Sequence, residues 1–67
     1  METKKIILKL RTERGMSQDE LANKVMVTRQ AVSRWENGDT VPNTDTLKLL
    51  SKEFDVSINT LWENPES

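Results

Sequence analysis

Four polar side chains near the middle of the sequence have the types and spacing to contact nucleic acid: Arg29, Gln30, Ser33 and Arg34. On a helix, which turns by about 100° per residue, they cover an arc of roughly 140°, and Val32 and Trp35 fall on the opposite side. An Arg guanidinium fits the two acceptors of guanine in the DNA major groove, and a Gln amide fits the acceptor and donor of adenine. The spacing therefore predicts a helix with one buried side and one DNA-reading side. The alternative for the four polar residues is an ordinary solvated face. The alternative for Trp35 is a platform on which bases stack, but its position around the helix assigns Trp35 to the core.

Two short helices joined by a tight turn are predicted for residues 18–37. Ser17 and Glu20 have the S-x-x-E spacing of a capping box, in which each side chain bonds the other residue's amide. The first of these helices ends near Val25, and Met26 occupies the turn. If that turn needs a positive φ, Met incurs a steric cost there that Gly would not.

Capping residues and Gly mark where the five predicted helices begin and end. The expected N-caps are Thr3, Ser17, Thr28, Asn43 and Ser57. The corresponding helices cover residues 4–14, 18–25, 29–36, 44–54 and a short segment from 58. Gly15 ends the first helix, Asn37-Gly38 ends the third, and Asp55 takes the position after the fourth.

Apolar residues recur at helical spacing, and nothing alternates as in a strand. The expected core is Ile7, Leu10, Leu21, Val25, Val27, Val32, Trp35, Leu47, Leu50, Phe54 and Leu61. Ala22 is small enough to let a neighbouring helix come close. The predicted fold class is therefore all-α, with five short helices in one domain (1–67), a core region 4–63 and a tail 64–67.

Composition argues against most enzymatic functions. The 67 residues contain no Cys and no His, which removes thiolate chemistry, disulfides and the commonest general base and metal ligand. We expect no cofactor, no metal and no small-molecule site. No apolar run approaches the roughly 18 residues that cross a membrane, and the N-terminus lacks a signal-peptide pattern, so we expect a cytoplasmic protein.

The net charge of −1 is unevenly distributed. Residues 1–37 hold eight Lys and Arg against five Asp and Glu, which gives +3, and residues 38–67 hold two against six, which gives −4. The helix predicted to read DNA lies in the positive half, although an acidic chain is in general a poor candidate for nucleic acid. The acidic half keeps open a protein-interaction module that binds a basic partner.

Two further residue pairs have two interpretations each. Arg11 is either a solvated charge or the partner of Glu36, and bidentate carboxylate pairing by Arg favours the pair. Ile58 and Trp62 either complete the core or form an apolar patch for a two-fold partner.

The chain resembles the Xre family of Cro/repressor-type helix-turn-helix proteins. The motifs are SQDELANKV-x-V-TRQAVSRWENG and, after Pro42, LKLLSKEFDVSINTL, so the resemblance covers roughly residues 7–62. It implies a five-helix lambda-repressor-like domain with the helix-turn-helix at its second and third helices. By resemblance, the base contacts are Thr28, Arg29, Gln30, Ser33 and Arg34, and the phosphate contacts are Gln18, Asn37, Thr40 and Arg11.

The resemblance also implies the partner and the role. We expect a transcriptional regulator, and specifically a repressor, that binds double-stranded DNA at a palindromic operator as a homodimer. Such dimers read half-sites about 34 Å apart. The alternative is an antitoxin-like or docking module of the same fold. The polar, cationic face of residues 29–34 favours DNA, since a docking face would expose apolar side chains.

Overall fold

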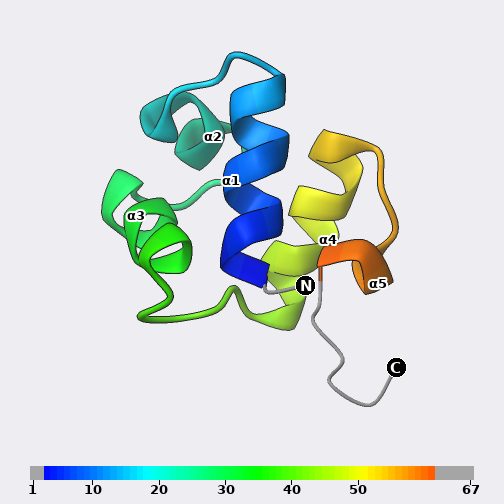
Figure 1. Cartoon of the computed structure of the whole chain (residues 1–67). Helices are drawn as coiled ribbons and strands as arrows, with labels where there is room; N and C mark the ends of the chain where they lie inside the picture. Colours follow the sequence, from blue (N-terminus) through cyan, green and yellow to red (C-terminus); the bar gives the residue numbers. More distant parts are fainter. Residues whose placement is uncertain (1–2, 62–67) are drawn as a thin grey trace.

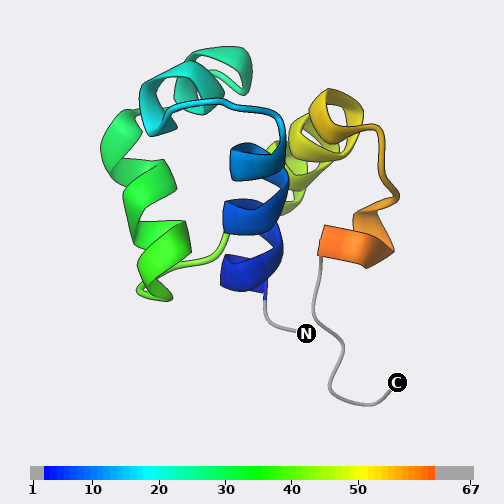
Figure 2. The same ribbon diagram turned by 45° about the horizontal axis from the view of Figure 1, so that its top comes forward.

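Five α-helices make up the regular structure of residues 3–61, which are the residues that the computed structural model describes. They are α1 (Thr3–Glu13), α2 (Gln18–Lys24), α3 (Arg29–Asn37), α4 (Thr44–Phe54) and α5 (Ile58–Leu61). Helix α1 stands between the α2–α3 pair and the α4–α5 pair (Figure 1; Figure 2) and packs against α3 and α5. The predicted all-α, five-helix fold is confirmed, and the described range contains no strand.

The capping predictions hold for the four later helices. The Glu20 amide donates to Ser17 Oγ at 3.1 Å, and the Ser17 amide donates to the Glu20 carboxylate at 2.9 Å, which completes the capping box. Thr28 and Asn43 each accept from the amide three residues on, at 3.2 and 2.8 Å, and Ser57 does so at 3.3 Å. Caps of this kind contribute about 1 kcal/mol each. Local sequence therefore fixes where these helices start.

The first helix departs from its prediction. Thr3 lies inside α1 rather than capping it, and the helix ends at Glu13, one residue earlier than expected. Thr3 is buried because it shares a stripe with Ile6 and Ile7, one turn further along. At the other end, Gly15 has a φ of 67°, as a left-handed residue after a helix should.

Within residues 3–61, two residues other than Gly adopt the left-handed backbone conformation. Met26, in the turn between α2 and α3, has a φ of 58°, and Asp55, after α4, has a φ of 55°. This conformation costs an L-residue about 1–2 kcal/mol. The Met26 side chain gains little in return, since that residue is 79% exposed. The turn of the α2–α3 unit is therefore held in place by the packing of its flanking helices.

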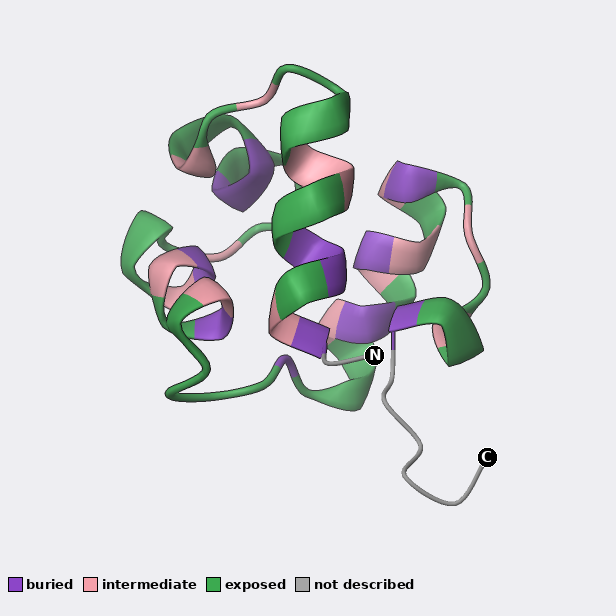
Figure 3. Ribbon diagram, viewed as in Figure 1, coloured by how far each residue is buried: buried purple, intermediate pink, exposed green. Residues whose placement is uncertain are grey.

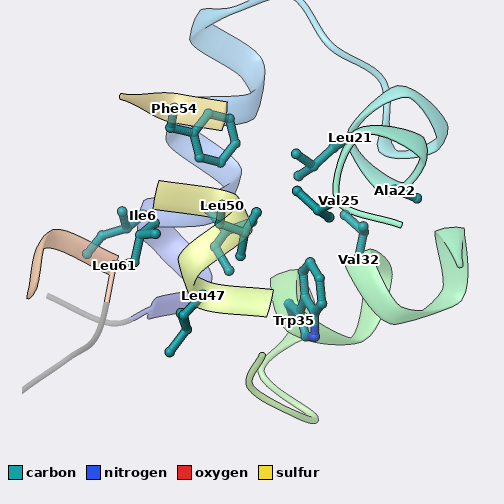
Figure 4. Close-up of a cluster of buried hydrophobic side chains, with 11 residues drawn as sticks. Ile6, Leu21, Ala22, Val25, Val32, Trp35, Leu47, Leu50, Phe54 and Leu61 are labelled. Carbon is teal, nitrogen blue, oxygen red and sulfur yellow. The ribbon is translucent and has the colours of Figure 1, made fainter. Parts of the chain in front are cut away.

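The core draws side chains from all five helices (Figure 4). Nine of the eleven predicted core residues are buried, whereas Leu10 and Val27 lie partly exposed at its margin. Ile6 and Ala22 are buried in addition. Ile6 was absent from the prediction because α5 packs on α1 and widens its buried arc; Figure 4 shows Ile6 beside Leu61.

Candidate nucleic-acid interface

Helix α3 is anchored from behind by two apolar side chains. Val32 is fully buried and Trp35 nearly so, and both join the cluster formed with Leu21 and Val25 of the α2 region (Figure 4). Figure 3 shows the buried parts of α3 on the flank that faces α1 and the exposed parts on the outer flank. The helix is therefore fixed in rotation, and its outer flank is left to solvent.

That outer flank carries the side chains predicted to read bases. Thr28, Arg29, Gln30 and Arg34 are exposed, and Ser33 is half-buried between them. Thr28 Oγ1 also accepts from the Ala31 amide as the N-cap. These residues supply guanidinium, amide and hydroxyl donors on one surface, and none of the five is apolar.

The carboxylate of Asp19 lies next to the first of these donors. Asp19 Oδ1 is 3.7 Å from Arg29 Nε, and the two side chains are 73% and 62% exposed. This pair was not predicted from the sequence. The positions of the two residues could have indicated it, because Asp19 and Arg29 occupy the first turns of consecutive helices joined by a tight turn.

Arg11 and Glu36 form the predicted ion pair, and Gln18 joins it. Arg11 Nε donates to Glu36 Oε2 at 2.6 Å, and Nη2 donates to Oε1 at 3.1 Å. The Gln18 amide donates to the same Oε1 at 2.9 Å, and Arg11 Nη1 donates to the Met16 carbonyl at 2.7 Å. This network, hereafter the Glu36 network, links α1, α2 and α3.

The Glu36 network orients two of the residues expected to contact phosphate. Each nitrogen of the Arg11 guanidinium makes a hydrogen bond, and its side chain is only 13% exposed. Arg11 is thus placed to orient α3, and because these bonds use three of the five N–H groups of the guanidinium, its phosphate contact stays a prediction. Gln18 stays half-buried at the start of α2, with its amide oriented by Glu36. The Gln18–Glu36 bond was not predicted, because it joins residues 18 positions apart.

The loop after α3 folds back on the end of that helix. The amides of Asp39 and Thr40 donate to the Arg34 carbonyl at 2.9 and 3.5 Å. Asn37, the last residue of α3, and Thr40 are both exposed. Both side chains are therefore open to solvent at the C-terminal end of α3, and their phosphate contacts stay a prediction.

The expected dimer seam is described only in part. Ile58 is half-buried and lines a groove between α4 and α5 together with Leu49 and Ser51. Trp62, the other residue assigned to that seam, lies outside the described residues. Within residues 3–61, no cluster of acidic side chains could hold a metal ion, and no helix is long and apolar enough to pass through a bilayer.

Comparison with known proteins gives one family match and one related protein for this chain. A family model described as Helix-turn-helix, HTH_3, matches residues 7–61. The HTH-type transcriptional activator BcrR of Enterococcus faecalis is 39% identical over 66 residues, which is 98% of this chain and 32% of that protein. The chain thus spans about a third of the length of this relative.

Two solved structures share the fold. The P22 c2 repressor in complex with a synthetic operator superposes with a TM-score of 0.89 at 30% identity, over 94% of this chain and 96% of that one. The solution structure of the P22 c2 repressor DNA-binding domain (1–76) gives a TM-score of 0.85 at 31% identity, over 91% of this chain and 80% of that one. The lambda-repressor-like architecture expected from the sequence is thereby confirmed.

Proposed function

The chain belongs to the helix-turn-helix family of DNA-binding transcription regulators, and from that premise we propose that it binds double-stranded DNA through α3 in the major groove. One observation carries the proposal: the outer flank of α3 exposes only polar side chains, while Val32 and Trp35 bury the inner flank. A major groove about 12 Å wide admits one α-helix presented in this way.

The proposed base contacts use three kinds of side chain: guanidinium, amide and hydroxyl. Arg29 and Arg34 supply the forked donors that suit guanine, and Gln30 supplies the donor and acceptor that suit adenine. Thr28 and Ser33 add hydroxyl groups that bond either kind of base edge. Each good bidentate contact contributes about 1–3 kcal/mol of discrimination against the wrong base.

Phosphate contacts position α3 and carry no sequence information themselves. We assign them to Gln18 at the start of α2 and to Asn37 and Thr40 at the end of α3. The start of α2 lies against the last turn of α3, because the Gln18 amide donates to Glu36 Oε1 at 2.9 Å, so these contacts would fix that end of α3 on the DNA backbone. Asp39 in the same loop carries a negative charge, which would weaken the backbone contact there.

A homodimer on a palindromic operator completes the proposal. One α3 helix reads too few base pairs for high specificity, and dimers of this motif read half-sites one helical turn apart. We assign the two-fold contact to the α4–α5 groove next to Ile58. Trp62, which lies outside the described residues, remains the second residue proposed for that contact. The finding of one half-site, or of half-sites whose spacing varies freely, would contradict this assignment.

Repression is the simplest regulatory outcome of this geometry, because a domain that occupies an operator blocks access to it without a second contact. Activation is the second candidate, and it is favoured by one observation, the activator role named for the relative from Enterococcus faecalis. A reporter with the selected site placed over or upstream of the promoter separates the two. Repression predicts reduced expression with the site over the promoter, and activation predicts increased expression with the site upstream.

The function itself is tested by selecting bound duplexes from a random DNA pool. We expect an inverted repeat whose half-sites are about 34 Å apart. The logarithm of the affinity should fall with the logarithm of salt concentration by about 0.9 per phosphate neutralised. Gln30→Ala should flatten the preference at one base pair per half-site and leave non-specific affinity nearly unchanged. If no duplex is enriched even at low salt, the protein-interaction alternative is favoured.

A further inference from the structure

Asp19 meets Arg29 at one particular edge of the guanidinium. The short distance, 3.7 Å, joins Asp19 Oδ1 to Arg29 Nε. A guanidinium is planar with five N–H groups, and its end-on edge, formed by Nη1 and Nη2, is distinct from the side-on edge that contains Nε. A carboxylate at Nε therefore leaves the outer pair of donors free, and that pair has the geometry that guanine O6 and N7 accept.

We propose that Asp19 is a positioning residue that orients the Arg29 fork toward a guanine, an inference that rests on the proposed DNA-binding function. An exposed Arg side chain samples many rotamers, and holding it in one geometry on a base loses part of that freedom. The ion pair restricts those rotamers before DNA arrives. Asp19 sits in the first turn of α2, and the capping box of Ser17 and Glu20 fixes the backbone that carries its side chain.

Asp19 should act in opposite directions on specific and non-specific binding. As a negative charge near the DNA backbone it repels phosphate and weakens binding to every duplex. As a partner of Arg29 it strengthens only the contact to the correct base. A carboxylate whose only role was to stabilise the start of α2 would change neither the base preference nor its position in the site.

The test compares Asp19→Asn with wild type on three duplexes: the selected site, the same site with the Arg29-dependent G·C pair replaced by A·T, and an unrelated duplex. Arg29→Ala identifies that base pair beforehand, by pool selection. We expect the G·C-over-A·T preference of Asp19→Asn to fall about two- to five-fold, the range of an exposed ion pair. Its affinity for the unrelated duplex should rise.

Asp39→Asn is the matched control, because it removes the same charge from the exposed loop after α3. It should raise affinity for all three duplexes by a similar factor and leave the G·C preference unchanged. In an Arg29→Lys background, Asp19→Asn should no longer alter the preference, because an ammonium has no fork to orient.

Two results would overturn the inference while the proposed function stands: a similar affinity gain for all three duplexes, or the same loss of preference in the Arg29→Lys background. A melting temperature of Asp19→Asn close to that of wild type excludes unfolding as the cause of any change. If the wild-type chain prefers no duplex at all, the proposed function fails and this inference fails with it.

Discussion

Removal of Glu36 tests how much the Glu36 network contributes to the stability of the domain. Glu36→Ala takes one carboxylate away from three donors: two nitrogens of Arg11 and the Gln18 amide. Arg11 would then be left charged in a site where its side chain is 13% exposed. Loss of one partner of a buried ion pair costs about 3–5 kcal/mol, mostly because the remaining charge is uncompensated.

That cost is large for a chain of this size. At about 0.05–0.15 kcal/mol per residue, a 67-residue domain has a folding free energy of roughly 3–10 kcal/mol. Glu36→Ala should therefore remove a third or more of the total stability. The double variant Arg11→Met with Glu36→Leu removes both charges, so it should cost only about 1–2 kcal/mol. The remaining cost reflects the Met16 carbonyl, which loses the donor at 2.7 Å.

Urea unfolding followed by helical circular dichroism measures these differences. If the free energy of unfolding falls by about 1 kcal/mol per molar urea, a loss of about 3 kcal/mol lowers the unfolding midpoint by about 3 M. The control is Lys24→Ala, which breaks the 3.8 Å pair with Glu53 where the side chains are 51% and 29% exposed. It should cost less than about 1 kcal/mol. The reasoning is refuted if Glu36→Ala costs no more than Lys24→Ala, or if the double variant is less stable than Glu36→Ala alone.

Three smaller changes follow from the same structure. Met26→Gly should stabilise the domain by about 0.5–1 kcal/mol in urea, because relief of the left-handed strain exceeds the added freedom of the unfolded chain; a lower midpoint would contradict this. Arg14→Ala should cost about 1–2 kcal/mol, since Arg14 donates to the Phe54 carbonyl and lies 5.1 Å from the centre of the Phe54 ring; Arg14→Lys should recover only part of that loss in the same titration. Ser17→Ala should lower stability by about 1 kcal/mol through loss of the capping box, and Ser17→Asp should restore most of it; equal melting temperatures for all three chains would show that the cap is unimportant.

Sequence alone predicted the parts of this fold that are decided within one helix. Caps such as Thr28 and Asn43 bond an amide three residues away, so residue type and spacing are sufficient. Burial of Val32 and Trp35 followed from the phase of one helix. The exposure of Arg29, Gln30 and Arg34 on the opposite flank followed from the same argument, and Ser33 lies half-buried between them.

The parts that sequence missed depend on how helices cross. Ile6 is buried because α5 packs on α1, and no pattern within α1 shows that α5 is there. The bonds from Gln18 to Glu36 and from Arg14 to Phe54 join residues 18 and 40 positions apart. The Arg11–Glu36 pair was predictable because Arg favours bidentate carboxylate geometry, which made the pair the favoured interpretation over a solvated Arg11.

Orientation of α3 and recognition by α3 are therefore carried by overlapping sets of side chains. Glu36 holds Gln18, and Gln18 is the phosphate contact we propose for the start of α2. Asp19, the next residue, holds Arg29, the first proposed base contact. A change at Asp19 should thus alter how α3 meets the groove without unfolding the domain, whereas a change at Glu36 should alter both the orientation of α3 and the stability of the domain. Because contacts that fix register and contacts that read bases are then coupled, the effects of Glu36 and Asp19 substitutions on base preference should be non-additive with those of Gln18 and Arg29.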